Sequence, residues 1–271
     1  MGDDKVLKAH FNAQWQSNFD KLSPGYEIFY WLPSEITVNS SWPTLEKYNS
    51  LISPNFALQT NQGLPIQFVQ EKSEESYEAT IYLSGKVHTR EQNWHDFFNM
   101  LIWYAFPLIK SDLNAKHFQH NNKIRTPFEN FLTLFDENGV IVLSSDNELL
   151  DLIRHMSWKE LFWYRRAELI SKCKFFIFGH SLHEKLLAPY IGLTGHSLLF
   201  YVEQNFFETT IENQLTKTNL LAQNWLRNIQ PSNVTPRTLL PLPILGIPGW
   251  HAESANEHFY SNSTYFRASR S

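Results

Sequence analysis

The chain has 271 residues, of which 15% are aromatic and only 10 are glycine. Its 23 Lys and Arg residues against 27 Asp and Glu residues give a net charge of −4. An aromatic-rich chain of this length can bury a large core, which excludes a mainly disordered protein. The weakly acidic charge argues against a dedicated nucleic-acid binder, because such proteins displace counterions with a basic surface.

The N-terminal part of the chain predicts helices and two β-hairpins. One hairpin would pair residues 65–69 with 77–83, because both segments are rich in β-branched and aromatic residues. The other would pair 131–135 with 140–144 across the Asn138-Gly139 dipeptide, which suits the positive φ angles of a tight turn. Helices are predicted over 10–22, 93–106, 107–120, 146–156, 157–171, 181–187 and 210–229, and a buried strand over 175–178.

The C-terminal segment is rich in proline and in apolar residues. Prolines from Pro231 to Pro248 exclude a long helix or a central strand. The same segment carries many Leu, Ile and aromatic residues, so we expect an irregular strap packed on the body of the protein. No change in composition marks a linker, and the sequence predicts one mostly helical α+β domain over residues 1–271.

Signals for export and membrane insertion are not seen. Cys173 is the single cysteine, so no disulfide can form within the chain, as is usual in a reducing compartment. The uncharged runs 97–109 and 186–202 are interrupted by proline or glycine and are shorter than the roughly 20 residues of a membrane span. We expect a soluble, cytoplasmic protein that binds neither membranes nor nucleic acid.

Three predicted helices carry polar side chains three or four residues apart, a spacing that places them on one face. Leaving such groups unpaired among aromatic residues would cost roughly 1–3 kcal/mol each. They are therefore expected to be hydrogen-bonded or to bind a ligand. The candidate catalytic residues from these helices are His95, Asp96, Asn99, Lys110, Asn114 and His117, and the third helix carries His180 and Glu184.

Imidazole and carboxylate groups on successive helical turns can share a divalent metal ion. His180, Glu184 and Asp136 are the candidate metal ligands, and a divalent ion is the only cofactor that the pattern indicates. Asp136 and its neighbour Glu137 also suit a simple turn, in which Asp is favoured.

A rigid segment can also frame a pocket. Trp250 and Asn256 in the C-terminal strap, together with Arg90, are candidate substrate-binding residues. A serine nucleophile at Ser181 is a weaker interpretation, because His183 is too large for the fifth position of a nucleophile elbow.

Several motifs resemble the bacterial family called domain of unknown function 3025. They begin with Thr89-Arg90, Trp94-His-Asp-Phe-Phe-Asn99 and Phe106-Pro107, continue with Thr133-Leu-Phe-Asp-Glu-Asn-Gly139 and Gly179-His180, and end with Leu242-Pro-Ile-Leu-Gly-Ile-Pro-Gly-Trp250. The similarity extends from about Gly25 to Arg267. The resemblance implies that the polar candidates lie at family motif positions. It does not supply a function, because the family has no established activity. Glu129-Asn130 departs from the Arg-Asp that is usual in this family.

Two functions account for these features. The first is a metal-assisted hydrolase of a small phosphorylated or amide substrate, with Lys110 and Arg90 binding an anion. The alternative is a non-enzymatic binding or scaffold protein, whose polar residues form a buried hydrogen-bond network. The expected partner is a small-molecule ligand, and the sequence does not indicate an oligomeric state. The two functions are separated by whether His95, His117 and His180 meet in one open pocket.

Overall fold

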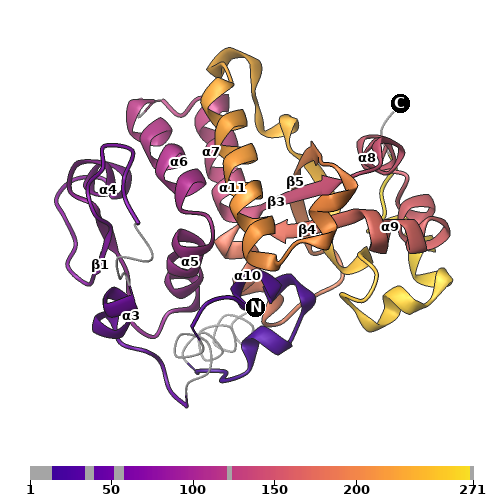
Figure 1. Ribbon diagram of the computed structural model, residues 1–271, viewed down its shortest axis with the longest axis horizontal. Coiled ribbons are helices and arrows are strands. Elements are labelled where there is room, and N and C mark those ends of the chain that lie inside the picture. The colour runs from indigo at the N-terminus through magenta and orange to yellow at the C-terminus, as the bar shows by residue number, and fades with distance from the viewer. Residues whose placement is uncertain (1–13, 34–39, 52–57, 121–123, 269–271) are drawn as a thin grey trace.

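The computed structural model describes residues 14–33, 40–51, 58–120 and 124–268. Most helices gather on one side of the molecule, and a four-stranded sheet lies next to them (Figure 1). The α-helices are α3 (Leu45–Leu51), α4 (Tyr77–Ser84), α5 (Trp94–Ala105), α6 (Pro107–Gln119), α7 (Pro127–Asn138), α8 (Asn147–Arg154), α9 (Arg166–Lys172), α10 (His180–Leu186) and α11 (Ile211–Asn228). The strands are β1 (Gln67–Val69), β2 (Lys86–His88), β3 (Gly139–Ser144), β4 (Cys173–Ile177), β5 (Thr194–Tyr201) and β6 (Leu240–Pro243).

The main sheet has the strand order β4-β3-β5-β6. Its centre is β3, which pairs antiparallel with β4 and parallel with β5. All six residues of β3 are buried, as expected for a strand covered on both faces. Strands β1 and β2 form a separate parallel pair. Helices and sheet together confirm the predicted α+β class.

Helices α5 and α6 form the centre of the helical side and begin where the sequence predicts. The Asn93 side chain accepts a hydrogen bond from the amide of Asp96 and so caps α5. Pro107 occupies the first turn of α6, where its missing amide hydrogen costs nothing. Most of α5 is buried, so its few polar side chains must face either a partner or a pocket.

Both expected hairpins are wrong. Residues 77–83 form helix α4, because Ser76 caps its first turn and Gly85 ends it with a left-handed φ of 72°. These end signals, with packing of α4 on α6, outweigh the strand preference of its residues. Helix α7 starts at a capping box between Thr126 and Glu129 and continues to Asn138. Gly139 has a φ of −66°, so it opens β3 directly and makes no turn.

The remaining predicted elements differ in how closely they match. Residues 10–13 of the helix expected over 10–22 lie outside the described residues, and the rest of it holds only a short 3₁₀ helix, Phe19–Lys21. The helix expected over 157–171 is divided by a π-helical turn, Glu160–Tyr164, ahead of α9. Among the described residues, no helix combines the length and apolar character needed to cross a membrane.

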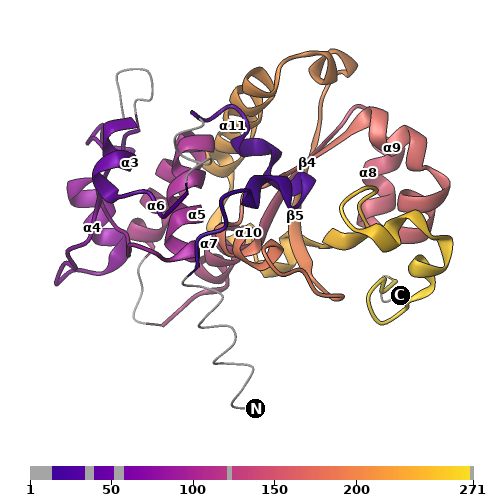
Figure 2. The same cartoon turned by 90° about the horizontal axis from the view of Figure 1, so that it is seen from below.

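The C-terminal strap packs on the body, as predicted, and runs past α8 and α9 (Figure 2). Leu242, Ile244 and Leu245 are fully buried. The strap is not wholly irregular, because β6 pairs with β5 at the edge of the sheet and includes Pro241 and Pro243. An edge strand tolerates proline because one side of it needs no hydrogen bonds.

Candidate functional site

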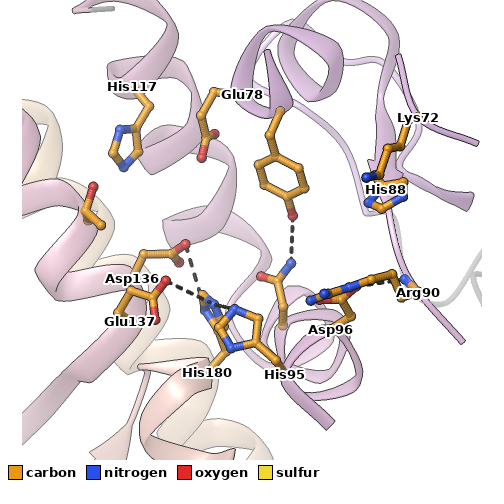
Figure 3. A pocket seen from close by; sticks show the side chains of 13 residues that line it. Lys72, Glu78, His88, Arg90, His95, Asp96, His117, Asp136, Glu137 and His180 are labelled. Atoms are coloured by element: carbon orange, nitrogen blue, oxygen red, sulfur yellow. Dashed lines mark hydrogen bonds and ion pairs between the residues drawn. The ribbon is translucent and has the colours of Figure 1, made fainter. Parts of the chain in front are cut away.

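A polar pocket of about 420 Å³ opens where α4, α5, α7 and α10 meet (Figure 3). The three histidines whose meeting was in question, His95, His117 and His180, all line it. The predicted residues Arg90, Asp96, Asn99 and Asp136 line it as well, together with the further residues Lys72, Tyr77, Glu78, His88, Thr133 and Glu137.

Gly179 lets two helix ends meet at this pocket. A Cβ atom added to Gly179 would lie 2.5 Å from the carbonyl oxygen of Glu137 and 2.6 Å from the Cα of Asn138. Only a glycine therefore allows the first turn of α10 to approach the last turn of α7 so closely. This approach brings His180 next to Asp136 and Glu137.

The imidazole rings of His95 and His180 are in direct contact. His95 Nε2 lies 3.0 Å from His180 Nε2, and the two rings are nearly perpendicular. His95 Nδ1 lies 3.1 Å from Glu184 Oε2. Because a carboxylate only accepts hydrogen bonds, Nδ1 of His95 carries a proton, and in the neutral ring its Nε2 is an acceptor that faces His180. The hydrogen bond to Glu184 also raises the pKa of His95.

His180 has a similar arrangement at its other nitrogen. Its Nδ1 lies 3.8 Å from Asp136 Oδ2 and makes no hydrogen bond with the described residues. Burial lowers the pKa of His180 to about 3, so the ring is neutral at neutral pH. Each histidine thus directs Nε2 toward the other and has a carboxylate near Nδ1, an arrangement common around metal-bound histidine.

Glu137 completes a group of three residues that could hold a metal ion. Ligand atoms of His95, Glu137 and His180 all lie within 4.8 Å of one another. Two imidazoles and one carboxylate are a frequent ligand set for zinc and other first-row divalent metals. The predicted ligand set of His180, Glu184 and Asp136 is therefore only partly reproduced, because Glu184 and Asp136 lie behind the histidines instead of beside them.

Lys110 holds the inner wall of the pocket together. Its ammonium group lies 2.6 Å from Asp136 Oδ1 and 2.9 Å from Asn99 Oδ1. Burial would raise the pKa of Asp136, but the charge of Lys110 and its hydrogen bond outweigh it and hold that pKa below its ordinary value. Asn99 Nδ2 donates in turn to the Tyr77 hydroxyl at 2.7 Å. Lys110 is thus committed to these protein partners, contrary to its expected role in anion binding.

Burial shifts the pKa of two titratable groups in the pocket so that each favours its neutral form. Burial and the charge of Asp136 raise the pKa of Glu78 to about 7. The Glu78 carboxyl accepts a hydrogen bond of 2.6 Å from Asn114 Nδ2. Burial lowers the pKa of His117 to about 4. Glu78 is therefore the side chain whose pKa suits proton transfer at neutral pH.

Three basic side chains, Lys72, His88 and Arg90, line the pocket across from the His95–His180 pair (Figure 3). Arg90 makes a bidentate ion pair with Asp96, with its Nε 2.8 Å from Oδ2 and its Nη2 2.9 Å from Oδ1. Lys72 and His88 have no hydrogen-bond or ion-pair partner among the described residues.

Residues 66–270 match the family model described as Protein of unknown function (DUF3025). The chain belongs to this family. The match confirms the resemblance, although it begins well after Gly25. No curated protein and no solved structure matches the chain.

Every residue that lines the pocket falls within the DUF3025 match. Glu129 and Asn130, where this chain departs from the family pattern, do not line the pocket. Glu129 instead caps α7 through Thr126, with its carboxylate 2.7 Å from the Thr126 amide. Both residues therefore lie outside the pocket lining of this DUF3025 protein.

Two predicted substrate-binding residues do not reach the DUF3025 pocket. Trp250 lines a separate hollow of about 190 Å³ next to Lys174 and Cys173. The Asn256 side chain caps a 3₁₀ helix, Glu257–Ser261, by accepting from the amide of His258. The structure brings neither residue together with the histidines.

Sequence reasoning missed Tyr77, Glu78, Lys72 and His88. The predicted hairpin over 65–83 includes Lys72, Tyr77 and Glu78 and gives them no helical face, and no motif in the sequence indicates His88. The capping serine at Ser76 and Gly85 after the apolar run were the signals that could have identified α4.

Proposed function

We propose that this protein is a metal-dependent hydrolase of a small phosphorylated or amide substrate. The observation that carries the proposal is the 3.0 Å separation of the Nε2 atoms of His95 and His180, with a carboxylate near the other nitrogen of each ring. At this distance the two nitrogens share either a proton, in an N–H···N hydrogen bond, or a cation. The nearby Glu137 carboxylate favours a divalent cation.

His95, His180 and Glu137 would hold the metal, and Glu184 and Asp136 would orient the two histidines. A divalent metal in such a site lowers the pKa of a bound water and so supplies a nucleophile at neutral pH. Glu78 would exchange protons with the reacting groups, because its pKa is near neutrality.

The reaction is the addition of water across one bond of the substrate. The water oxygen forms a bond to the phosphorus or carbonyl carbon, and the bond to the leaving oxygen or nitrogen breaks. The leaving atom takes a proton from Glu78, and the proton lost by the water restores the carboxyl group. No other reactant is required.

A scaffold role remains the second candidate, supported by the chain of hydrogen bonds from Asp136 through Lys110 to Asn99. Such a chain also fits a network that specifies one packing. The open pocket, and the lack of a partner for the Lys72 and His88 side chains within the described part of the chain, favour a ligand-binding role.

Metal analysis tests the proposal directly. Protein purified without chelator should contain stoichiometric metal, and metal-free protein should bind Zn²⁺ in calorimetry. His180→Ala should weaken Zn²⁺ binding at least about 100-fold, in line with the loss of a direct ligand. His258→Ala, which removes an exposed histidine, should bind as the wild type does. Absence of Zn²⁺ binding by the wild type would refute the proposal.

Activity requires a separate measurement. Metal-loaded protein should hydrolyse some member of a panel of phosphate monoesters and small amides, and Glu78→Gln should slow that turnover by about 100-fold or more. Metal binding without any turnover on the panel would argue for a binding protein.

A further inference from the structure

We infer that the Tyr77 hydroxyl recognises an anionic oxygen of the ligand, because a one-way chain of hydrogen bonds leaves its hydrogen free to point into the pocket. The inference deepens the proposed function, on which it rests in treating the pocket as a substrate site. It selects the phosphorylated substrate from the two classes considered above.

The direction of the chain is set by Lys110. An ammonium group can only donate hydrogen bonds, so the Asn99 atom that lies 2.9 Å from Lys110 Nζ must be the amide oxygen. The other end of the Asn99 amide is then the NH₂ group, which donates to Tyr77 Oη at 2.7 Å. Asn99 therefore cannot accept the hydroxyl hydrogen of Tyr77.

The Tyr77 hydrogen has no acceptor among the described residues. A phenol carries a single hydrogen, and here its oxygen is occupied as an acceptor. The side chain is 39% exposed and lines the pocket. Burial of the hydroxyl and nearby carboxylates raise the pKa of Tyr77, so the hydroxyl keeps its proton at neutral pH. The Tyr77 hydroxyl can therefore donate a hydrogen bond to a ligand in the pocket.

The surroundings indicate that the acceptor is anionic. Lys72 and Arg90 line the same pocket as Tyr77, and Lys72 has no acidic partner among the described residues. A side pocket of about 200 Å³ also begins at Lys72, Tyr77 and His88 and gives room for the remainder of a ligand. A tetrahedral oxyanion offers several acceptor oxygens, so it can take hydrogen bonds from Tyr77 and Lys72 at once.

The opposite wall makes anion binding depend on the metal. Asp136, Glu137 and Glu78 face the pocket and would repel an anion at neutral to alkaline pH. A divalent ion held by His95, Glu137 and His180 would offset this repulsion. Phosphate should therefore bind more tightly to metal-loaded protein than to metal-free protein.

Calorimetric titration with inorganic phosphate tests the role of Tyr77. In the Zn²⁺-loaded protein, Tyr77→Phe should weaken phosphate binding by about tenfold or more, the usual effect of losing a hydrogen bond to a charged group. Tyr82→Phe is the matched control, because Tyr82 lies on the same helix and its ring stacks on Phe118 instead of lining the pocket. Equal phosphate affinity of wild type and Tyr77→Phe would overturn the inference, as would absence of phosphate binding by the wild type.

A second test reverses the direction of the hydrogen bond between residue 99 and Tyr77. Asn99→Asp replaces the donating NH₂ group by a carboxylate oxygen, so Tyr77 must donate to it and cannot donate to the ligand. The new charge also repels phosphate, and a double-mutant cycle removes this contribution. Tyr77→Phe should have no further effect on phosphate binding in the Asn99→Asp background. A further loss equal to that seen in the wild-type background would contradict the one-way chain.

The outcomes separate this inference from the proposed function. If Zn²⁺ does not bind but phosphate binds in a Tyr77-dependent manner, the metal-dependent hydrolase fails and the role of Tyr77 stands. If Zn²⁺ binds and Tyr77→Phe changes nothing, the inference fails and the proposed function stands.

Discussion

At the scale of single residues, burial has different consequences in one small pocket. It lowers the pKa of His180 to about 3 and raises the pKa of Glu78 to about 7, because desolvation disfavours whichever form is charged. Asp136 is buried as well, yet its pKa falls because Lys110 lies 2.6 Å away. The pocket therefore combines groups whose burial favours the neutral form with a buried carboxylate, Asp136, whose charged form is stabilised by Lys110.

The raised pKa of Glu78 predicts a pH dependence of stability. The folded protein binds this proton more tightly than the unfolded chain, so the favourable contribution of Glu78 is complete below pH 4.5 and disappears as the pH rises to about 7. Glu78→Gln removes this effect. Relative to wild type, the variant should gain stability by up to about 3 kcal/mol across that interval.

Urea denaturation of both proteins at several pH values measures this difference. Glu75→Gln, at an exposed position just before α4, controls for the lost charge. A stability difference between Glu78→Gln and wild type that stays constant with pH would show that Glu78 is not desolvated in the folded state.

The residues of the site could be predicted in part. Helical spacing identified His95 with Asn99 and Lys110 with His117, because positions on one helical face depend only on sequence separation. The same spacing paired His180 with Glu184, but it could not show that Glu184 bonds to His95 on another helix. Contacts between helices depend on tertiary packing, and the spacing of residues within one helix carries no information about it.

At the scale of elements, the two errors concern how segments begin and end. Strand preference within 77–83 is weak compared with the cap at Ser76 and the left-handed Gly85, and Asn138-Gly139 makes a tight turn only when both flanking segments are strands. Helices α5 and α6, whose starts are marked by the capping Asn93 and by Pro107, match the prediction well. Because the prediction lacks α4, it also lacks Tyr77 and Glu78, which this helix contributes to the pocket.

The contact between α7 and α10 predicts that Gly179 controls metal binding. Gly179→Ala places a Cβ against the Glu137 carbonyl and must push the two helix ends apart. Since ligand geometry tolerates little change, Zn²⁺ affinity should fall by about tenfold or more. The φ of Gly179 is −67°, so the effect is steric and not a backbone strain.

Gly192→Ala is the control for this prediction. Gly192 has a φ of 111° and no atoms near an added Cβ, so alanine there strains the backbone without moving α10 against α7. Calorimetry should show normal Zn²⁺ affinity in Gly192→Ala, even if its melting temperature falls. Normal Zn²⁺ affinity in Gly179→Ala would show that this contact does not position the ligands.

At the scale of the whole molecule, the pocket joins the helical side to the sheet. His95 comes from α5, Glu137 from the end of α7 just before β3, and His180 from the helix that follows β4. The pairing of β3 with β4 places the last two segments together, because Val140 lies opposite Ile177. The α+β class followed from the sequence, but the sheet pairing that gathers the ligands did not, since it joins segments far apart in the chain.

Global stability distinguishes a ligand-binding pocket from a structural network. His117 lines the pocket without a hydrogen-bond partner among the described residues, and burial lowers its pKa to about 4. Folding therefore loses stability as the pH falls from 6.5 toward 4, where the unfolded chain binds the proton more readily. His117→Ala should change the free energy of unfolding by less than about 1 kcal/mol at pH 8 and should be relatively more stable than wild type at pH 5.

His183→Ala is the structural comparison, because His183 is fully buried against Phe29 and lies 3.1 Å from the Gly179 carbonyl through Nδ1. It should lose about 2–4 kcal/mol at pH 8. The loss should be smaller at pH 5, because burial lowers the pKa of His183 to about 3 and the wild type is itself destabilised there. Equal, large losses in the two variants, measured by urea denaturation, would place His117 in a structural network and favour the scaffold function.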